Sequence, residues 1–274
     1  MPELPEVETI KNDLAQNIIN RSIKKIIINN AKVIKEPQPA KFSALLKNAR
    51  FDSIIRRGKL LIFAVKTQAG KKLFLVVHLR MTGQLVYGVL NEKSRVSLIL
   101  SNSQVLNYND PRLLGELRVR TQWQDLSFVR RLGPEPFTKD FNLKSFKENI
   151  LKRKAKIKSL LLDQKFIAGL GNIYAVEALF QAKINPSRIA CSLKNKEIEL
   201  LFKSIIKILK AAIQCRGSSV DDYRDGYGQK GTFVQKLKVY DRKGEKCLRS
   251  RCKAKIKRIV LSGRGTYFCP GCQV

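Results

Sequence analysis

The sequence contains few acidic residues, a single histidine and no long apolar run. Asp and Glu number 22 against 54 Lys and Arg, which gives a formal net charge of +32. The absence of any stretch of about 18 uncharged apolar residues argues against a transmembrane helix. The first nine residues also lack the basic start and apolar centre of a secretory signal, so we expect no such signal.

The composition nevertheless allows packed cores and limits the class of partner. The chain has 274 residues, of which 44% are hydrophobic, so two domains are the natural expectation. The excess of positive charge favours an extended polyanion, because neutralising phosphates releases condensed counterions. A ribosome-like or generally adhesive basic protein is the alternative. The charge therefore predicts a nucleic-acid partner before any motif is considered.

Four of the six cysteines lie in the last 28 residues, in two pairs. Cys247 and Cys252 are separated by four residues, Cys269 and Cys272 by two, and sixteen residues lie between the pairs. Four thiolates in two knuckles suit a closed tetrahedral Zn²⁺ site, with two disulfides or free thiols as the alternatives. The lack of a signal indicates a reducing cytoplasm, which favours zinc. The two remaining cysteines lie in helical sequence and should be packing residues.

Most of residues 22–130 has the pattern of β-strands. Runs of β-branched and apolar residues, separated by Gly, Asn and Asp turns, read SIKKIIIN, LLIFAV, KLFLVVHL, RVSLILS and ELRVR. Two helices are expected, at about 6–17 and at 40–49. These patterns predict an antiparallel sandwich or a barrel-like first domain.

The second half of the chain has a helical period. Two prolines and a glycine in RRLGPEPFTKD (130–140) predict a linker. After it, apolar residues recur at three- and four-residue steps over 142–163, 172–182 and 194–215. The polar, glycine-rich stretch 216–233 should be a mobile loop. Two short strand-like runs lie between the cysteine pairs.

Three short motifs have both a functional and an ordinary structural interpretation. GLGNIYA (169–175) precedes a helix, and its glycines and helix N-terminus could bind phosphate with Asn172 as a side-chain contact; many helices also simply start after glycine. The lone His78 follows an apolar strand, where histidine is more often structural. The Asp-Pro turn before Arg112, Leu113 and Leu114 could present a wedge to stacked bases, or could be an ordinary turn.

The opening MPELPEVET could carry chemistry at the chain end. Removal of Met1 would expose Pro2 as a secondary amine, and an α-amine has a pKa of roughly 7.7–8.0. A neutral amine of this kind attacks carbonyl or sugar carbons and forms Schiff bases, and Glu3 could transfer protons. A frayed terminus is the alternative.

Together these stretches closely resemble the bacterial formamidopyrimidine-DNA glycosylases, which remove oxidised purines from DNA. The likeness runs from residue 2 to residue 273 and is carried by PELPEVET, RRGKLL, HLRMTG, DPR, LGPEP, GLGNIYA, VYDRKGE and RGTYFCPGC. The resemblance implies an α+β multidomain fold. It comprises an N-terminal antiparallel β-sandwich over 1–131, a linker over 132–139, a helix–two-turn–helix domain with a mobile lesion loop over 140–232, and a zinc finger over 233–274.

The resemblance implies a bifunctional DNA glycosylase and AP lyase of base excision repair. Such an enzyme excises 8-oxoguanine and formamidopyrimidines after the nucleotide has left the base stack, and cleaves the strand by β,δ-elimination. Pro2 would attack the sugar carbon and hold it as a Schiff base, with Glu3 as proton donor. Lys59 would assist the first elimination and Arg264 the second. Glu6 would support the site.

The resemblance also implies an extended contact with damaged double-stranded DNA, in the cleft between the two halves. Met81, Arg112 and Leu114 would fill the gap in the stack, with Arg112 facing the widowed cytosine. A loop at about 217–231 would close over the flipped base. The other implied DNA contacts are Lys59, His78, Lys93, Arg153, Asn172, Tyr240 and Arg264.

The remaining expectations concern the metal, the assembly and the location. The four clustered cysteines would hold one structural Zn²⁺ per monomer, and the protein would be a monomer in the bacterial cytoplasm, associated with the nucleoid and not with a membrane. The chain departs from the family pattern at Leu114, usually aromatic, in two extra residues of the first knuckle, and near Lys93, where histidines are common.

Two related functions stay open at this point. The sister glycosylase for oxidised pyrimidines begins PEGP, whereas this chain has PELPE. A non-catalytic damaged-DNA-binding protein would be favoured if Met1 were retained, because an acylated proline nitrogen has no nucleophilic lone pair. A generic zinc-containing nucleic-acid binder would not explain the coincidence of Pro2, Glu3, Lys59 and Arg264.

Overall fold

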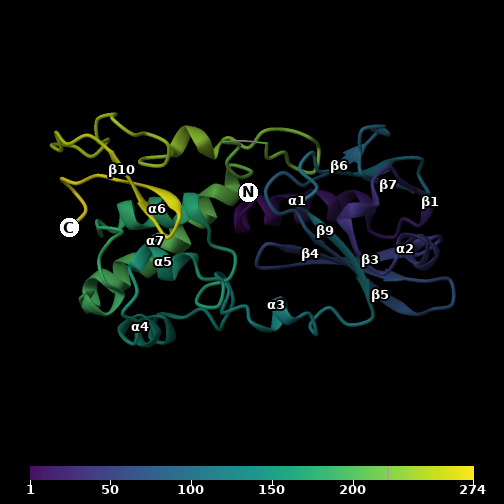
Figure 1. The fold of residues 1–274 in the computed structure, drawn as a ribbon, viewed down its shortest axis with the longest axis horizontal. Helices are drawn as coiled ribbons and strands as arrows, with labels where there is room; N and C mark the ends of the chain where they lie inside the picture. The colour runs from purple at the N-terminus through teal and green to yellow at the C-terminus, as the bar shows by residue number, and fades with distance from the viewer. Residues whose placement is uncertain (221) are drawn as a thin grey trace. The chain divides into compact units, whose positions relative to one another are not determined.

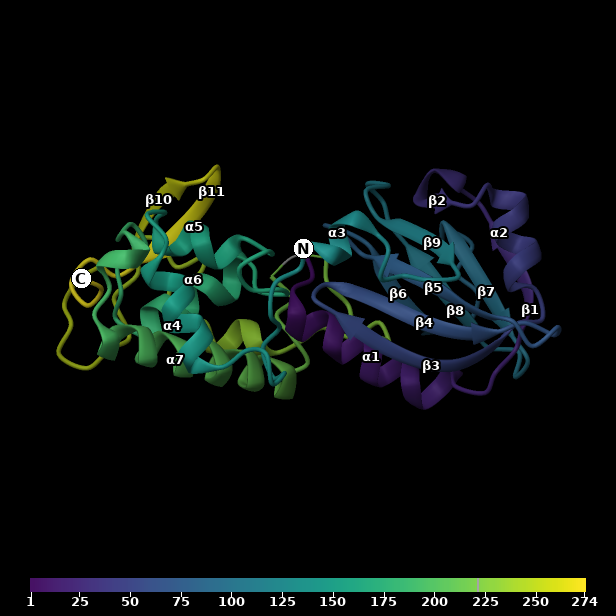
Figure 2. The ribbon, with the colours of Figure 1, turned by 90° about the horizontal axis from the view of Figure 1, so that it is seen from below.

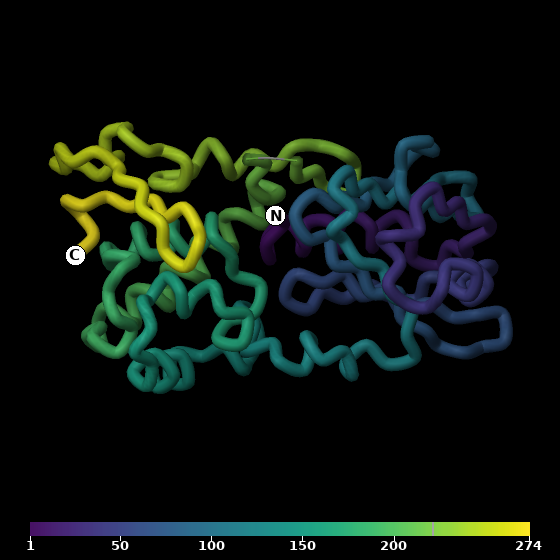
Figure 3. The backbone as a smooth tube through the Cα atoms, viewed as in Figure 1, coloured from purple at the N-terminus to yellow at the C-terminus, as the bar shows by residue number. Residues whose placement is uncertain are grey.

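A computed structural model describes residues 1–220 and 222–274. The chain divides into two compact units (Figure 1). The first combines Met1–Arg130 with Ile213–Val234, and the second combines Arg131–Ala212 with Gln235–Val274. The chain therefore passes from the first unit to the second, returns for one segment and leaves again, a path that Figure 3 traces.

The first unit is a β-sandwich. Its two sheets are antiparallel except for one parallel pair, β2 with β9. The four-stranded sheet has the order β1 (Ile23–Ile28), β7 (Val96–Leu100), β8 (Val105–Asn109), β6 (Gln84–Gly88). The five-stranded sheet has the order β2 (Ile34–Glu36), β9 (Glu116–Arg120), β5 (Lys72–His78), β4 (Leu60–Lys66), β3 (Arg50–Arg57). Figure 2 shows both sheets.

One hydrophobic core joins the two sheets to the first helix. Leu98 of β7 and Phe63 of β4 belong to the same buried cluster, so the inner faces of the sheets pack together. Helix α1 (Leu4–Ile18) adds Val7, Ile10 and Leu14, all fully buried at helical spacing. Because each such side chain contributes about 1.5–3 kcal/mol on burial, α1 is firmly fixed on the sandwich.

The predicted elements of this unit are largely present, with shifted ends. The first helix begins earlier than expected, because Pro5 lies in its first turn, where a missing N–H costs nothing. Helix α2 (Pro39–Leu46) ends before 49. The sequence pattern predicts no separate strand for β2, β3, β6 or β8. Three of them are edge strands, and β3 (RFDSIIRR) has mostly exposed or half-buried residues that weaken its apolar signal. Two short pieces, η1 (Ala31–Val33) and α3 (Ser127–Arg130), complete the unit.

The second unit combines helices with a β-hairpin. The helices are α4 (Leu143–Leu151), α5 (Ile157–Leu162), α6 (Asn172–Gln181) and α7 (Asn195–Gln214), with the short η2 (Ala190–Ser192) and η3 (Phe233–Lys236). The last two residues of α7 and the first two of η3 belong to the first unit. The hairpin, β10 (Lys257–Leu261) with β11 (Arg264–Phe268), provides the two predicted strands between the cysteine pairs.

The single helical period predicted over 142–163 is two helices. The chain leaves helical geometry between α4 and α5, where Lys156 forms a β-bridge with Ile189 and Ile157 N–H donates to the Arg188 carbonyl at 2.7 Å. The basic run KRKAK supplies no large apolar residue to continue the buried face of a helix. The pairing with Arg188 and Ile189 therefore determines the backbone conformation there. Within the described residues, no helix combines the length and the apolar character that crossing a membrane requires.

Candidate functional site

The N-terminus is held at the start of α1. Glu3 is the N-cap in extended conformation, and its backbone N–H donates to Glu6 Oε2 at 2.8 Å. Pro2 is buried and Met1 is exposed. Because the N-terminus of a helix carries partial positive charge, it disfavours the protonated form of an amine placed there. The position therefore suits a neutral, nucleophilic Pro2 nitrogen after removal of Met1.

Two carboxylates at this helix start and one lysine of the same unit are buried. Glu3, Glu6 and Lys59 are 3%, 2% and 8% exposed. Lys59 lies in the turn between β3 and β4, and α1 packs against both strands. Burying charged groups is costly unless they are used or compensated. The first unit thus contains the proton donor Glu3, the elimination residue Lys59 and the supporting Glu6 that the family resemblance implies.

His78, at the end of β5, is a neutral hydrogen-bonding group. Its Nδ1 accepts from the Arg80 backbone N–H at 3.0 Å, which leaves the proton on Nε2. Burial, with a further contribution from the Arg80 charge, lowers the pKa of His78 from 6.5 to about 3. The predicted phosphate contact of His78 would therefore be an uncharged N–H donor.

The three residues predicted to fill the base stack sit on two adjacent loops. Met81 and Leu114 are 46% and 43% exposed, and Arg112 is exposed too. The loops are joined because Thr82 Oγ1 donates to Asp110 Oδ1 at 2.6 Å. Exposed apolar tips on a braced support are typical of a binding surface.

Asp110 is a buried bracing residue that the sequence pattern does not reveal. It is 1% exposed, and besides Thr82 it accepts from the Gly115 backbone N–H at 2.6 Å. A Cβ at position 115 would lie 1.6 Å from the Tyr108 hydroxyl, so only glycine fits this close approach. The DPR motif, read for its exposed arginine, thus also contains the aspartate that shapes the loop.

The glycine-rich stretch after α7 contains no helix or strand between 217 and 232 among its described residues, as predicted for a loop. Asp221, which lies within the predicted lesion loop, is outside the described residues. Ser218 N–H donates to Glu6 Oε1 at 2.8 Å, so the loop is attached to the same carboxylate that holds the Glu3 N–H. The mobility of this loop stays a prediction.

In the second unit, Asn172 and Arg264 lie on connected elements. Asn172 is the first residue of α6, and its Nδ2 donates to the Gly265 carbonyl in β11 at 3.1 Å. Arg264 is the first residue of β11, exposed after a tight turn in which Ser262 and Gly263 have positive φ. The contact links the predicted phosphate-binding helix start to the strand that carries Arg264.

Tyr240 is positioned by a buried glutamate that the sequence did not reveal. Glu177 of α6 is 2% exposed, and it accepts the backbone N–H groups of Lys238, Val239 and Tyr240 at 2.9–3.0 Å. Burial raises the pKa of Glu177, although the three N–H groups act in the opposite direction. The Tyr240 ring also packs 5.3 Å from that of Tyr267. Arg153 and Lys93, the other predicted contacts, are exposed on loops.

The four clustered cysteines have the geometry of a metal site. Their sulfur atoms lie within 4.8 Å of one another, with Cys247 and Cys272 3.8 Å apart and Cys252 and Cys269 3.6 Å apart. Zn–S bonds of about 2.3 Å in a tetrahedron place sulfurs about 3.8 Å apart. The four thiolates therefore fit one Zn²⁺, and all six cysteines are free of disulfides.

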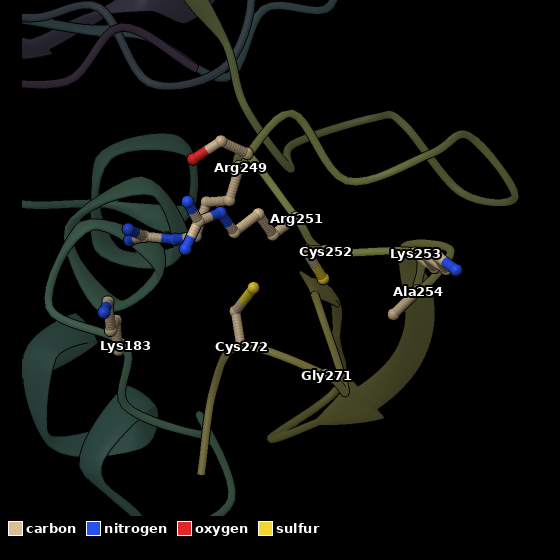
Figure 4. A pocket seen from close by; sticks show the side chains of 9 residues that line it. Lys183, Arg249, Arg251, Cys252, Lys253, Ala254, Gly271 and Cys272 are labelled. Atoms are coloured by element: carbon tan, nitrogen blue, oxygen red, sulfur yellow. The ribbon is translucent and has the colours of Figure 1, made fainter.

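The wide first knuckle is used to dock the metal site onto α6. Arg249 stacks 4.5 Å from the Phe180 ring and donates to the Phe180 carbonyl at 2.6 Å, at the end of α6. With Lys183 and Arg251 it lines a cavity of about 460 Å³ beside Cys252 (Figure 4). The extra knuckle residues thus extend the finger's packing and leave the cysteine geometry intact.

The sequence matches three family models. They are the formamidopyrimidine-DNA glycosylase N-terminal domain over 1–117, the formamidopyrimidine-DNA glycosylase H2TH domain over 132–224, and a zinc finger found in FPG and IleRS over 244–274. The three matches together span most of the chain.

Relatives and solved structures agree with these matches. Formamidopyrimidine-DNA glycosylases of Desulfitobacterium hafniense and Cytobacillus firmus are 41% and 40% identical, over all of this chain and all of theirs. The Lactococcus lactis Fpg in complex with DNA containing an abasic site is 37% identical and has a TM-score of 0.90, with 99% of both chains covered. A mutant of that protein, bound to DNA containing Fapy-dG, has a TM-score of 0.89.

Proposed function

This chain belongs to the formamidopyrimidine-DNA glycosylase family, and from that premise we propose that Pro2, freed of Met1, is the nucleophile of its reaction. The protein is a bifunctional DNA glycosylase and AP lyase of base excision repair. It carries a zinc finger whose four cysteines hold one structural Zn²⁺. Its partner is DNA, and its relatives named above are bacterial enzymes. The oxidised-pyrimidine and purely binding alternatives are not favoured.

The observation that carries the proposal is the placement of Pro2 next to Glu3, the N-cap of α1, whose N–H is held by the buried Glu6. The Pro2 nitrogen attacks the sugar carbon of the lesion, and the bond to the base breaks as Glu3 supplies a proton. Glu3 then takes the proton of the attacking N–H group and passes it to the ring oxygen as the bond between that oxygen and the attacked carbon breaks, which gives an iminium ion that acidifies the neighbouring sugar carbon. Lys59 then assists loss of one phosphate and Arg264 loss of the other, which leaves a gap in the strand.

Borohydride trapping tests this assignment directly. Processed protein is mixed with a duplex containing 8-oxoguanine opposite cytosine, reduced, and digested for peptide mass mapping. We expect one covalent adduct, on the N-terminal peptide at Pro2. An adduct on Lys59, or tight binding with no adduct, would contradict the proline mechanism.

We further propose the DNA-contact roles that the sequence suggested. Met81, Arg112 and Leu114 fill the gap left by the flipped base, and their shared support through Asp110 favours a joint action. The family's usual aromatic residue would stack better than Leu114, so kinking of DNA depends more on Met81 here. Backbone phosphates are contacted by Lys59, His78, Lys93, Arg153, Asn172, Tyr240 and Arg264.

His78→Ala and Arg153→Ala are predicted to affect DNA binding differently. The neutral His78 contributes a hydrogen bond and no charge, so His78→Ala should lower affinity by about 3- to 10-fold without changing the slope of log K against log salt. Arg153→Ala should reduce that slope by about 1. Titrations of a lesion duplex at four salt concentrations measure both. A smaller slope of log K against log salt in His78→Ala than in the wild type would show that the imidazole is charged.

The pKa of His78 also predicts a pH dependence. Because the folded value, about 3, lies below the unfolded value of 6.5, the unfolded chain binds the extra proton between them. The contribution of His78 to stability is therefore complete above pH 6.5 and decreases as the pH falls below it. Denaturant unfolding of the wild type and His78→Ala at pH 5 and 7.5 should show a smaller pH effect in the variant.

We propose the functional domains as 1–131 for the catalytic sandwich, 132–139 for the linker, 140–232 for the helix–two-turn–helix domain and 233–274 for the zinc finger. The family-model matches at 1–117, 132–224 and 244–274 support this division. By contacts, Ile213–Val234 groups with the sandwich, although it begins with the last two residues of α7.

We also propose an oligomeric state and a cellular location for the protein. We infer that the protein acts as a monomer associated with the bacterial nucleoid, because its net charge of +32 favours DNA and disfavours close approach of a second copy. Light scattering at low and high salt, with and without a lesion duplex, should give the mass of one chain per DNA. A dimer under these conditions would overturn this inference.

A further inference from the structure

The loop after α7 is built into the first unit. Tyr223 is 7% exposed and belongs to the hydrophobic core of the sandwich. The Gly226 carbonyl accepts from the Tyr87 backbone N–H of β6 at 2.8 Å. The loop therefore continues α7 in the chain but rests on the sandwich, near β6 in Figure 1.

A single guanidinium ties this loop to α1. Arg216 Nη2 donates to Asp13 Oδ2 and to Asp225 Oδ2, each at 2.6 Å, and Arg216 Nε donates to Asp225 Oδ2 at 2.9 Å. The Asp13 and Asp225 side chains are 7% and 0% exposed. Two buried carboxylates that share one cation depend on it, because removing the cation would leave two uncompensated charges.

The same carboxylates shape the loop backbone. Asp225 Oδ1 accepts the backbone N–H groups of Tyr227 and Gln229 at 3.0 and 2.8 Å, which closes a turn. Asp13 Oδ2 accepts the Gly226 N–H at 3.0 Å. A Cβ at position 226 would lie 2.6 Å from the Asp13 Cβ, so the loop backbone lies directly against α1.

The helix that holds the loop is the helix that begins beside Pro2. Glu6 and Asp13 are seven residues apart on α1, about two turns, and so face the same side. Glu6 binds the N–H groups of Glu3 and Ser218, while Asp13 binds Arg216 and Gly226. The loop is thus aligned to the N-terminus through α1, at two points.

We propose that Asp13, Arg216 and Asp225 are positioning residues that align the loop with Pro2, and that they set the preference for a base-containing lesion over a base-free site. This inference rests on the proposed function, in which the loop closes over the flipped base while Pro2 attacks the sugar. An abasic site offers the loop no base. Its cleavage therefore depends on Pro2, on the elimination residues Lys59 and Arg264 and on the DNA contacts, and not on the loop.

The test compares two duplexes that differ only at the lesion, 8-oxoguanine or an abasic site opposite cytosine. Single-turnover rates of base excision and of abasic-strand cleavage are measured for the wild type, Asp13→Ala and Arg216→Gln. We expect excision to fall at least about tenfold in both variants while abasic cleavage stays within about twofold. Asp13→Asn, which keeps an acceptor for the Gly226 N–H, should recover part of the loss.

Two controls separate positioning from general destabilisation. Glu197→Ala removes the Arg188–Glu197 ion pair of the second unit, and it should leave the ratio of the two rates unchanged. Asp13→Ala with Arg216→Gln should be no worse than Arg216→Gln alone, because the two act in one network. Equal losses on both duplexes, or an unchanged ratio in both variants, would overturn the inference. A wild type that forms no Pro2 adduct on either duplex would instead refute the proposed function.

Discussion

Pro2→Gly is expected to reduce base excision by roughly 10³-fold or more, the scale of losses seen when a covalent nucleophile is removed. The variant keeps a terminal amine, but it loses the secondary amine and the ring that hold the nitrogen at the start of α1. Glycine also loosens the residue before the N-cap, because it has far more backbone freedom than proline. Attack on the sugar carbon should therefore become slow and poorly aligned.

Duplex binding by Pro2→Gly should stay within about threefold of the wild type, because the predicted phosphate contacts lie elsewhere. Single-turnover excision of 8-oxoguanine and trapping with borohydride measure the chemical step, and a binding titration under the same conditions is the control. Excision at the wild-type rate by this variant would contradict the proline mechanism. A parallel loss of binding would show instead that the N-terminus supports the fold.

The second large effect is expected at the metal site. Cys272→Ser should lower the zinc content from one ion per chain to nearly none, because a closed four-thiolate site tolerates the loss of a ligand poorly. Structural Zn²⁺ in small fingers contributes about 10–16 kcal/mol of apparent binding free energy. The hairpin of β10 and β11 has a small core that contains Cys247 and Cys269. The finger should unfold, and lesion-duplex affinity should fall at least about tenfold.

The matched control for this variant is Cys191→Ser, which changes a half-buried cysteine outside the cluster. It should retain one zinc per chain by native mass spectrometry and bind DNA normally. Cys272→His should recover part of the zinc, since imidazole nitrogen is also a zinc ligand. Unchanged zinc content in Cys272→Ser would refute the four-cysteine site. The sandwich should stay folded in every variant, because the four clustered cysteines and Cys191 all belong to the second unit.

The features that the sequence predicted correctly share one property, which is that each depends on residues close together in the chain. The cysteine pairs have knuckle spacing, and the structure brings all four sulfurs within 4.8 Å. The GLGNIYA motif predicted a helix start at Asn172, and α6 begins there. The expected strands between the cysteine pairs are β10 and β11. In each case a few residues of chain determine the geometry, so spacing alone is informative.

Other supporting residues gave no local signal. Glu177 sits within a helical pattern as one polar residue among many, yet it binds three backbone N–H groups some sixty residues away. Asp110 reads as the start of an ordinary turn, yet it braces two loops. A buried carboxylate is recognised by what surrounds it, and those partners are distant in the chain.

The sequence by itself indicated the polyanionic partner and the metal ligands through composition and short-range spacing, and the enzyme class through motifs that resemble the family. The amine of Pro2 stays a prediction. Only the tertiary structure decided how the loop after α7 is held. Arg216 and Asp13 are 203 positions apart, and their pairing exists because the fold returns Ile213–Val234 to the sandwich and against α1. Such a contact depends on the packing of the whole core, which short-range patterns do not specify.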